Sequence, residues 1–134
     1  IASHQKLEIV PGPAAMEDVV LFMKRSGGAW GARPEVIAKA TSALNELMET
    51  LQAQQLIKGP LLIDASFEEF NLNVDVSYQG ELLAISQQRP TEQELLEDDM
   101  AFVRLSGFLL TKFADKISSE QKNDRCHVHF NFQH

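Results

Sequence analysis

Apolar and polar residues alternate along the chain with two periods, and each period predicts its own kind of element. An alternation of period two predicts a β-strand with one buried face, whereas apolar residues three or four positions apart predict an amphipathic helix. Strands are predicted at residues 6–10, 61–67, 71–78, 116–119 and 125–132, and residues 81–85 are expected to continue as a strand or a strand end. In 71–78, Leu72, Val74 and Val76 alternate with polar residues, which predicts a half-buried antiparallel strand.

Helical spacing predicts two helices between the first strand and the central ones. The first begins at Pro13, a residue suited to the first turn of a helix, and is expected to end at the Ser-Gly-Gly of 26–28. A loop at 29–33 carries the only tryptophan, Trp30, which is expected to cap the local core. The longest helix covers about 34–54. Its apolar face consists of Val36, Ile37, Ala40, Leu44, Leu47, Met48 and Leu51.

Two further helices are predicted after the central strands. Thr91 is suited to be the N-cap of the first, and Glu94 completes a capping box. The second is marked by Phe102, Leu105, Leu109 and Phe113. Strands and helices grouped in blocks, with few βαβ units, predict an α+β fold: a two-layer sandwich whose mixed, mainly antiparallel sheet has helices on one face. We expect a single domain at 5–134, with residues 1–4 a linker or a vector-derived remnant, because the chain does not begin with Met.

The composition is that of one globular domain, and its charge excludes several classes of partner. Hydrophobic residues make up 44% and charged residues 23% of the 134 positions. The net charge of −7, with 12 scattered Lys and Arg residues, argues against nucleic-acid binding and against adsorption on an anionic membrane. No apolar run approaches the roughly 18 residues of a membrane span, so direct membrane insertion is not expected. Cys126 is the only cysteine, which excludes an internal disulfide and fits a reducing compartment.

Two histidines, His127 and His129, alternate on the outward face of the last predicted strand. They could hold a metal together with His134 or an acidic residue, but an exposed polar edge is the commoner meaning of this spacing, and we predict no metal site. Cys126 falls on the inward face, where we expect a small core residue rather than a nucleophile. The acidic run at 97–99 is expected to match the dipole of the helix that follows it.

Four short segments carry a resemblance to a known family. They are Ala-Leu-Asn-Glu-Leu-Met-Glu-Thr-Leu at 43–51, Val-Ser-Tyr-Gln-Gly at 76–80, Leu-Ser-Gly-Phe-Leu-Leu at 105–110 and Phe-Ala-Asp-Lys-Ile at 113–117. Together with the order of the elements, they resemble the histidine-kinase-like ATPase fold, and within it the small anti-sigma-factor kinases. The resemblance covers nearly the whole chain, and it implies that this fold accounts for the single domain.

The first nucleotide motif of that family is incomplete here. The long helix of the family carries Glu-x-x-x-Asn, in which the Glu positions a nucleophile and the Asn coordinates magnesium. Glu46 matches the Glu, but Thr50 stands in place of the Asn, and a neutral hydroxyl is a poorer magnesium ligand. From their spacing alone, Glu46 and Thr50 also fit a solvated helix face shared with Ser42 and Glu49, and we favour that interpretation.

The second and third motifs are damaged as well. In Asp-x-Gly-x-Gly the family's Asp accepts a hydrogen bond from the adenine amino group. Here Tyr78 stands at that position, Gly80 matches the first Gly, and Leu82 replaces the second. Of the paired glycines that let the family's lid approach the phosphates, only Gly107 remains, so we expect a closed cleft. The resemblance thus implies a degenerate nucleotide pocket, without a bound cofactor or catalytic residues, at Glu46, Thr50, Tyr78, Gly80 and Gly107.

A narrower resemblance rests on the residues at 29–33, 70–74 and 77–83. These segments look like the cytoplasmic C-terminal extension of some bacterial xanthine/uracil permeases, which is a degenerate kinase-like ATPase domain. The resemblance implies a regulatory or interaction domain that is not an enzyme and is tethered at the inner membrane through the permease portion of the same chain. Its role would be to dock on that portion, to form a homodimer or to sense a ligand. The alternative is an ATP-binding, anti-sigma-factor-like serine/threonine protein kinase, against which the damaged motifs argue.

Overall fold

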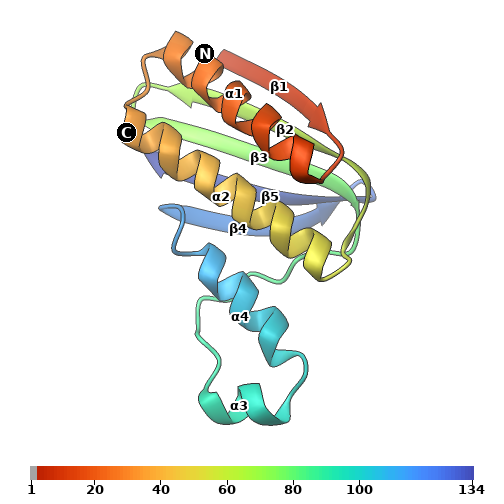
Figure 1. Ribbon diagram of the computed structural model, residues 1–134. Helices are drawn as coiled ribbons and strands as arrows, with labels where there is room; N and C mark the ends of the chain where they lie inside the picture. Colours follow the sequence, from red (N-terminus) through yellow and green to blue (C-terminus); the bar gives the residue numbers. More distant parts are fainter. Residues whose placement is uncertain (1–2) are drawn as a thin grey trace.

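One antiparallel sheet organises the protein, and the computed structural model describes residues 3–134 of it. The elements in chain order are β1 (Ser3–Ile9), α1 (Pro13–Trp30), α2 (Pro34–Ala53), β2 (Ile57–Glu68), β3 (Asn71–Gly80), α3 (Glu92–Glu97), α4 (Ala101–Leu110), β4 (Lys116–Lys122) and β5 (Arg125–Gln133). The strands lie in the order β1-β2-β3-β5-β4, and each neighbouring pair is antiparallel (Figure 1).

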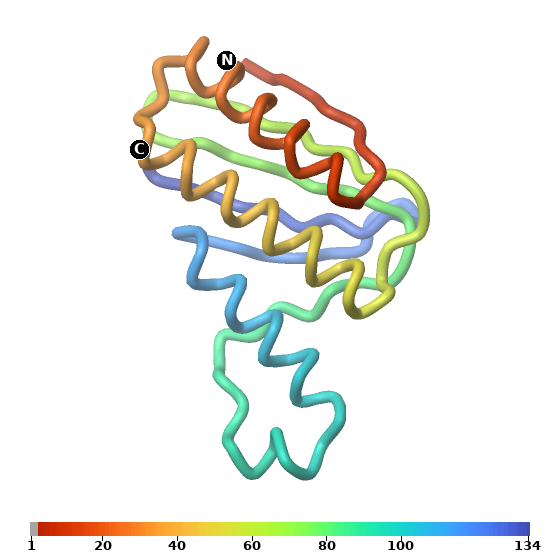
Figure 2. The backbone as a smooth tube through the Cα atoms, viewed as in Figure 1, coloured from red at the N-terminus to blue at the C-terminus, as the bar shows by residue number. Residues whose placement is uncertain are grey.

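Helices α1 and α2 pack side by side across one face of the sheet (Figures 1 and 2). Leu44, Leu47 and Leu51 of α2 are at most 1% exposed, and they belong to the same core as the inward residues of the strands. The two-layer α+β sandwich with helices on one face is therefore confirmed, and the sheet is antiparallel throughout. No helix within residues 3–134 is both long and apolar enough to cross a membrane.

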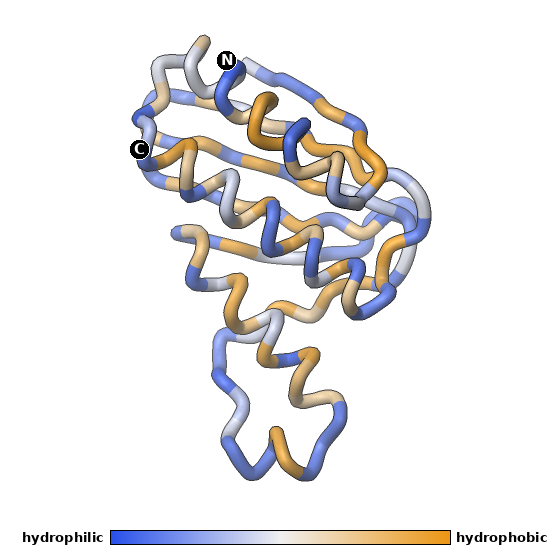
Figure 3. The backbone as a smooth tube through the Cα atoms, in the orientation of Figure 1, coloured by the Kyte–Doolittle hydropathy of each residue, from blue (hydrophilic) through white to orange (hydrophobic). Residues whose placement is uncertain are grey.

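The strands keep their apolar residues on the helical side. In β3, Leu72, Val74 and Val76 are at most 1% exposed, as are Val128 and Phe132 in β5. Polar residues occupy the intervening positions, an alternation that is visible along the strands in Figure 3. Because helices α1 and α2 cover only one side, the second face of the sheet is polar and open to solvent.

Helices α3 and α4 form an arm that extends away from the sheet (Figures 1 and 2). Thr91 caps α3, and the capping box with Glu94 is formed as predicted. The Arg104 guanidinium joins the two helices, at 3.4 Å from Glu94 Oε2 and 2.9 Å from Asp98 Oδ2. The C-terminal end of α4 returns to the core, where Leu110 is fully buried.

The end of α1 differs from the sequence prediction. The helix continues through the two glycines to Trp30, and Gly31, with a left-handed φ of 74°, ends it. Gly27 is buried where α1 meets α2, and a Cβ there would overlap with the side chain of Ile37. This glycine therefore allows close helix packing rather than ending the helix. Trp30 caps the core as expected, because it is half-buried and stacks on Phe67 with ring centroids 5.9 Å apart.

Two strands begin earlier than predicted. β1 begins at Ser3, and His4 pairs with Ser66, so both residues belong to the sheet although the sequence places 1–4 outside the domain. Residues 1 and 2 lie outside the described part. β2 begins at Ile57 because an irregularity in its pairing, between Lys58 and Leu61, absorbs the intervening Gly-Pro.

The prediction of a strand or strand end at 81–85 is wrong. β3 ends at Gly80, and residues 81–86 form no regular element. The Tyr78 hydroxyl donates to the Glu81 carbonyl at 2.9 Å and accepts from the Leu83 amide at 3.2 Å. Backbone groups that a strand would pair with its neighbour are here bonded to a side chain, so the connection leaves the sheet and leads to the arm.

Candidate functional site

The two predicted pocket residues on α2 differ in exposure to solvent. Glu46 is half-buried, whereas Thr50 is 7% exposed and lies one turn before the end of the helix. The solvated face expected from the spacing holds for Ser42 and Glu49, which are exposed. It is wrong for Thr50, which is buried.

Tyr78, which the resemblance aligns with an adenine-reading Asp, is fully buried. Its hydroxyl already makes the two backbone hydrogen bonds that turn the chain after β3. Burial is the main cause that raises the pKa of this phenol, and the nearby Cys126 raises it further. The hydroxyl therefore stays protonated and engaged with the backbone, and it cannot replace a carboxylate as an acceptor for the adenine amino group.

The two matching glycines are each required by contacts within the protein. Gly80 has a φ of 144°, and a Cβ there would overlap with the backbone oxygen of Leu56. At Gly107, in α4, a Cβ would overlap with the backbone oxygen of Ala84. Both glycines therefore serve close backbone approach, and the second one packs α4 against the connection that Tyr78 holds in place.

Three of the predicted pocket residues, Tyr78, Gly80 and Gly107, thus contact protein segments that pack closely against them. Tyr78 binds the Leu83 amide, and the neighbouring Ala84 lies against Gly107. Gly80 lies against Leu56, which follows α2. A surface hollow of about 390 Å³ lies elsewhere, between α1 and α2, and is lined by Met16, Glu17, Val20, Leu21 and Asn45.

Cys126 lies beside Tyr78 on the inward face of β5, as predicted, and it is fully buried. Its thiol donates to the Gly80 carbonyl, with sulfur and oxygen 3.4 Å apart. Burial raises the pKa of the thiol, so the thiolate that a nucleophile requires is disfavoured. Cys126 is therefore a core residue rather than a reactive one.

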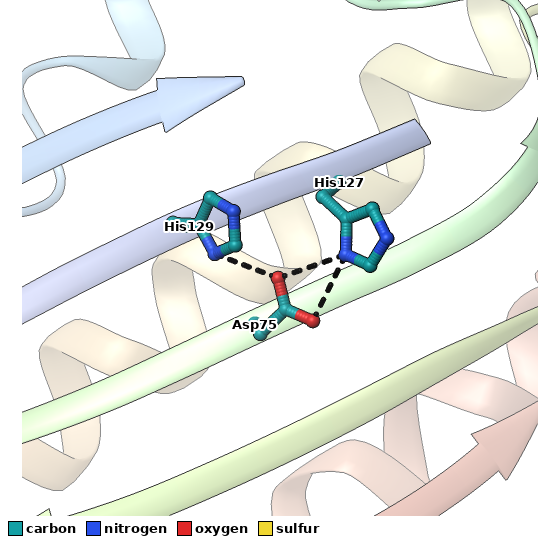
Figure 4. A group of neighbouring side chains, drawn as sticks. All are labelled: Asp75, His127 and His129. Atoms are coloured by element: carbon teal, nitrogen blue, oxygen red, sulfur yellow. Dashed lines mark hydrogen bonds and ion pairs between the residues drawn. The ribbon is translucent and has the colours of Figure 1, made fainter. Parts of the chain in front are cut away.

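The polar face of the sheet carries the densest group of ligand-type side chains among residues 3–134. Asp75 of β3 pairs in register with His129 of β5, and the three side chains of Asp75, His127 and His129 point toward one another (Figure 4). Asp75 Oδ1 lies 2.7 Å from His129 Nδ1, and Asp75 Oδ2 lies 3.2 Å from His127 Nδ1. The two imidazole rings are stacked with centroids 5.8 Å apart.

Glu120 of β4 extends this cluster. Its Oε1 lies 3.1 Å from Nε2 of His129, so this imidazole has a carboxylate at each ring nitrogen. His134, the histidine named as a further ligand from the sequence, lies apart from the cluster: its Nε2 accepts from the Arg33 amide at 2.9 Å. The outward position of His127 and His129 is as predicted, whereas Asp75 and Glu120 were not identified because strand register decides which acids face them.

No family model matches this sequence, and no curated protein matches it. The resemblance to histidine-kinase-like ATPases therefore stays a prediction, and the α+β sandwich stands on the sheet and helices described above.

Proposed function

We propose that this chain is a non-catalytic interaction domain, the cytoplasmic tail of a bacterial permease of the xanthine/uracil class. The observation that carries the non-catalytic part is the complete burial of Tyr78, whose hydroxyl is held by the backbone of Glu81 and Leu83. An adenine-reading position needs an available acceptor in an open slot. A buried, doubly engaged phenol provides neither.

The surroundings of Gly107 support the same proposal. In active relatives the lid glycines bring backbone amides to the phosphates, as the resemblance implies. Here Gly107 lies within α4 and faces the backbone of Ala84. The glycine therefore serves helix packing, and its presence is explained without a phosphate.

The α3–α4 arm supports contact with another protein. Leu96 is 87% exposed, Met100 58% and Phe102 61%, and all three lie on this arm. Burying apolar surface contributes roughly 25 cal/mol per Å² to the free energy of association, so covering these side chains would stabilise a complex with a partner. We propose the membrane portion of the permease, or a second copy of the chain, as that partner.

A nucleotide titration tests the non-catalytic part. Isothermal calorimetry of the 134-residue chain with ATP and Mg²⁺ is expected to show no saturable heat, and an active anti-sigma-factor kinase serves as the positive control. Saturable, magnesium-dependent binding below about 1 mM, a range typical of enzyme–substrate affinities, would overturn the proposal and favour the protein-kinase alternative.

The arm is tested with two matched substitutions. Phe102→Glu and Phe70→Glu each place a charge at a phenylalanine of similar exposure, 61% and 63%, but Phe70 lies in the β2–β3 turn away from the arm. The readouts are binding to the detergent-solubilised permease portion and self-association by sedimentation equilibrium. We expect Phe102→Glu to weaken one of these by about tenfold or more and Phe70→Glu to leave both unchanged.

Equal behaviour of the two variants would refute the role of the arm. The permease assignment has its own test, which is the coding sequence upstream of Ile1. If that sequence encodes no hydrophobic spans, the permease assignment fails, while the nucleotide titration still decides whether the domain is catalytic.

A further inference from the structure

We infer that Asp75, His127 and His129 form a binding site for a divalent transition-metal ion of the zinc class, on the face of the sheet opposite α1 and α2. Two imidazoles and one carboxylate are a ligand set that zinc accepts, and three protein ligands leave a fourth position for water or for a group from outside. The site is independent of the predicted nucleotide-pocket residues at Tyr78 and Gly80, because Asp75 points to the face of β3 opposite the buried Tyr78.

The spacing of the ligand atoms fits a single ion. One ligand atom from each of the three residues lies within 4.8 Å of the other two. Zinc binds nitrogen and oxygen at about 2.0–2.2 Å, so two ligands in a tetrahedral site stand about 3.3 Å apart. His127 Nδ1 and Asp75 Oδ2 are already 3.2 Å apart. His129 Nδ1 and Asp75 Oδ1 are 2.7 Å apart, so these two atoms would move apart by about 0.6 Å to share an ion.

The strands hold these ligands in place before any metal binds. Asp75 and His129 are register partners on adjacent central strands, and His127 stands two residues along β5 on the same face. Their backbone is fixed by hydrogen-bonded pairing on both sides. An ion therefore requires little ordering of the chain, which favours affinity.

Glu120 supplies the outer contact that a metal-bound His129 would use. His129 has a carboxylate at each ring nitrogen, Asp75 at Nδ1 and Glu120 at Nε2. With a metal at Nδ1, the Nε2–H still donates to Glu120. Metal-bound histidines usually make this outer hydrogen bond to a carboxylate, which orients the ring. Glu120 is thus a positioning residue for His129.

Charge and access allow a cation to bind, and the type of ligand favours a transition metal such as zinc over Mg²⁺ or Ca²⁺. Asp75 and Glu120 supply two carboxylates, and the chain as a whole has a net charge of −7. The side chains of His127, Asp75 and His129 are 21%, 33% and 42% exposed, so an ion can enter from solvent. Hard cations prefer sites made of oxygen alone, whereas imidazole favours zinc, copper and nickel.

The test is calorimetric titration of the 134-residue chain with ZnCl₂, with MgCl₂ and CaCl₂ in parallel. We expect one zinc per chain and no saturable binding of the other two. His127→Ala and His129→Ala are expected to weaken zinc binding by far more than tenfold, and Glu120→Gln by about 10- to 100-fold. His4→Gln is the matched control, because His4 Nδ1 also contacts a carboxylate, Asp64 Oδ1 at 2.9 Å, but has no second imidazole.

A measurement on the unsubstituted chain removes any ambiguity from misfolded variants. In NMR spectra of the histidine ring protons, added zinc is expected to shift the signals of His127 and His129 and to leave those of His4 and His134 in place. Absence of saturable zinc binding, unchanged affinity in both histidine variants, or ring shifts confined to His4 and His134 would each overturn the site.

Discussion

Removing the hydroxyl of Tyr78 is the sharpest test of how the connection between β3 and the arm is held. Tyr78→Phe keeps the buried ring and deletes one atom that donates to Glu81 and accepts from Leu83. Leu83 is fully buried, so its amide loses its partner where water cannot replace it, whereas Glu81 is exposed and its carbonyl can turn to solvent. One buried, unsatisfied amide costs about 1–3 kcal/mol of the free energy of unfolding.

The assay is urea denaturation, in which the midpoint is expected to fall at an unchanged m-value. Thr41→Val is the matched control, since it also deletes one hydroxyl at nearly constant volume. The Thr41 hydroxyl donates to the Ile37 carbonyl at 2.8 Å, and this carbonyl can still accept the ordinary helix hydrogen bond. We expect the control to cost less than about 0.5 kcal/mol. Equal losses in the two variants would refute the role assigned to Tyr78.

The same substitution also changes the response to alkaline pH. Because burial raises the pKa of Tyr78 in the folded protein, the unfolded chain loses this proton at about pH 10 while the folded chain keeps it. Above that pH the unfolded state binds fewer protons, so stability falls as pH rises. Tyr78→Phe lacks this contribution, and its deficit relative to the unsubstituted chain is expected to shrink above pH 10. A constant deficit would contradict the assignment.

Three further substitutions test the packing and the caps, each by thermal or urea unfolding. Leu47→Ala removes a fully buried side chain of α2 and is expected to cost about 2–5 kcal/mol of the free energy of unfolding, whereas the same change at Leu96, 87% exposed, is expected to cost well under 1 kcal/mol. An unchanged midpoint for Leu47→Ala would contradict the packing of α2 on the sheet. Gly107→Ala places a Cβ against a backbone oxygen and is expected to destabilise the protein by about 1–3 kcal/mol. Gly28→Ala, with open space around it in α1, is expected to be neutral or stabilising by up to about 1 kcal/mol. Similar results for the two would show that α4 has room for a side chain at Gly107. Thr91→Ala removes the capping box of α3 and is expected to cost about 0.5–2 kcal/mol; an unchanged midpoint would contradict a contribution of this cap to stability.

Features set by neighbouring residues were predictable from the sequence. The apolar stripe of α2, the alternation in β3 and β5, and the capping box at Thr91 each depend on spacings of two to four residues. These spacings determine which side of an element is apolar. They therefore also predicted the two-layer sandwich and the inward position of Cys126.

Contacts between distant segments were decided only by the tertiary structure. The Ser-Gly-Gly at 26–28 predicts a helix end, yet Gly27 lies inside α1. The side chain of Ile37 from the next helix occupies the space that a Cβ at Gly27 would fill. Residues 81–85 were expected to continue the strand before them, yet the Tyr78 hydroxyl binds their backbone and turns it away from the sheet. In both cases a contact made by a side chain from outside the segment overrides its local preference.

The polar cluster on the open face was also only partly predictable from the sequence. The sequence alone places His127 and His129 on the outward face of a strand, because side chains alternate with a period of two. The acids beside them are 52 and 9 positions away from the histidines they contact, and a register shift of one residue would move Asp75 or Glu120 to the other face of the sheet. Register depends on how the whole sheet buries its apolar side against α1 and α2, and it is this packing that brings two imidazoles and two carboxylates together.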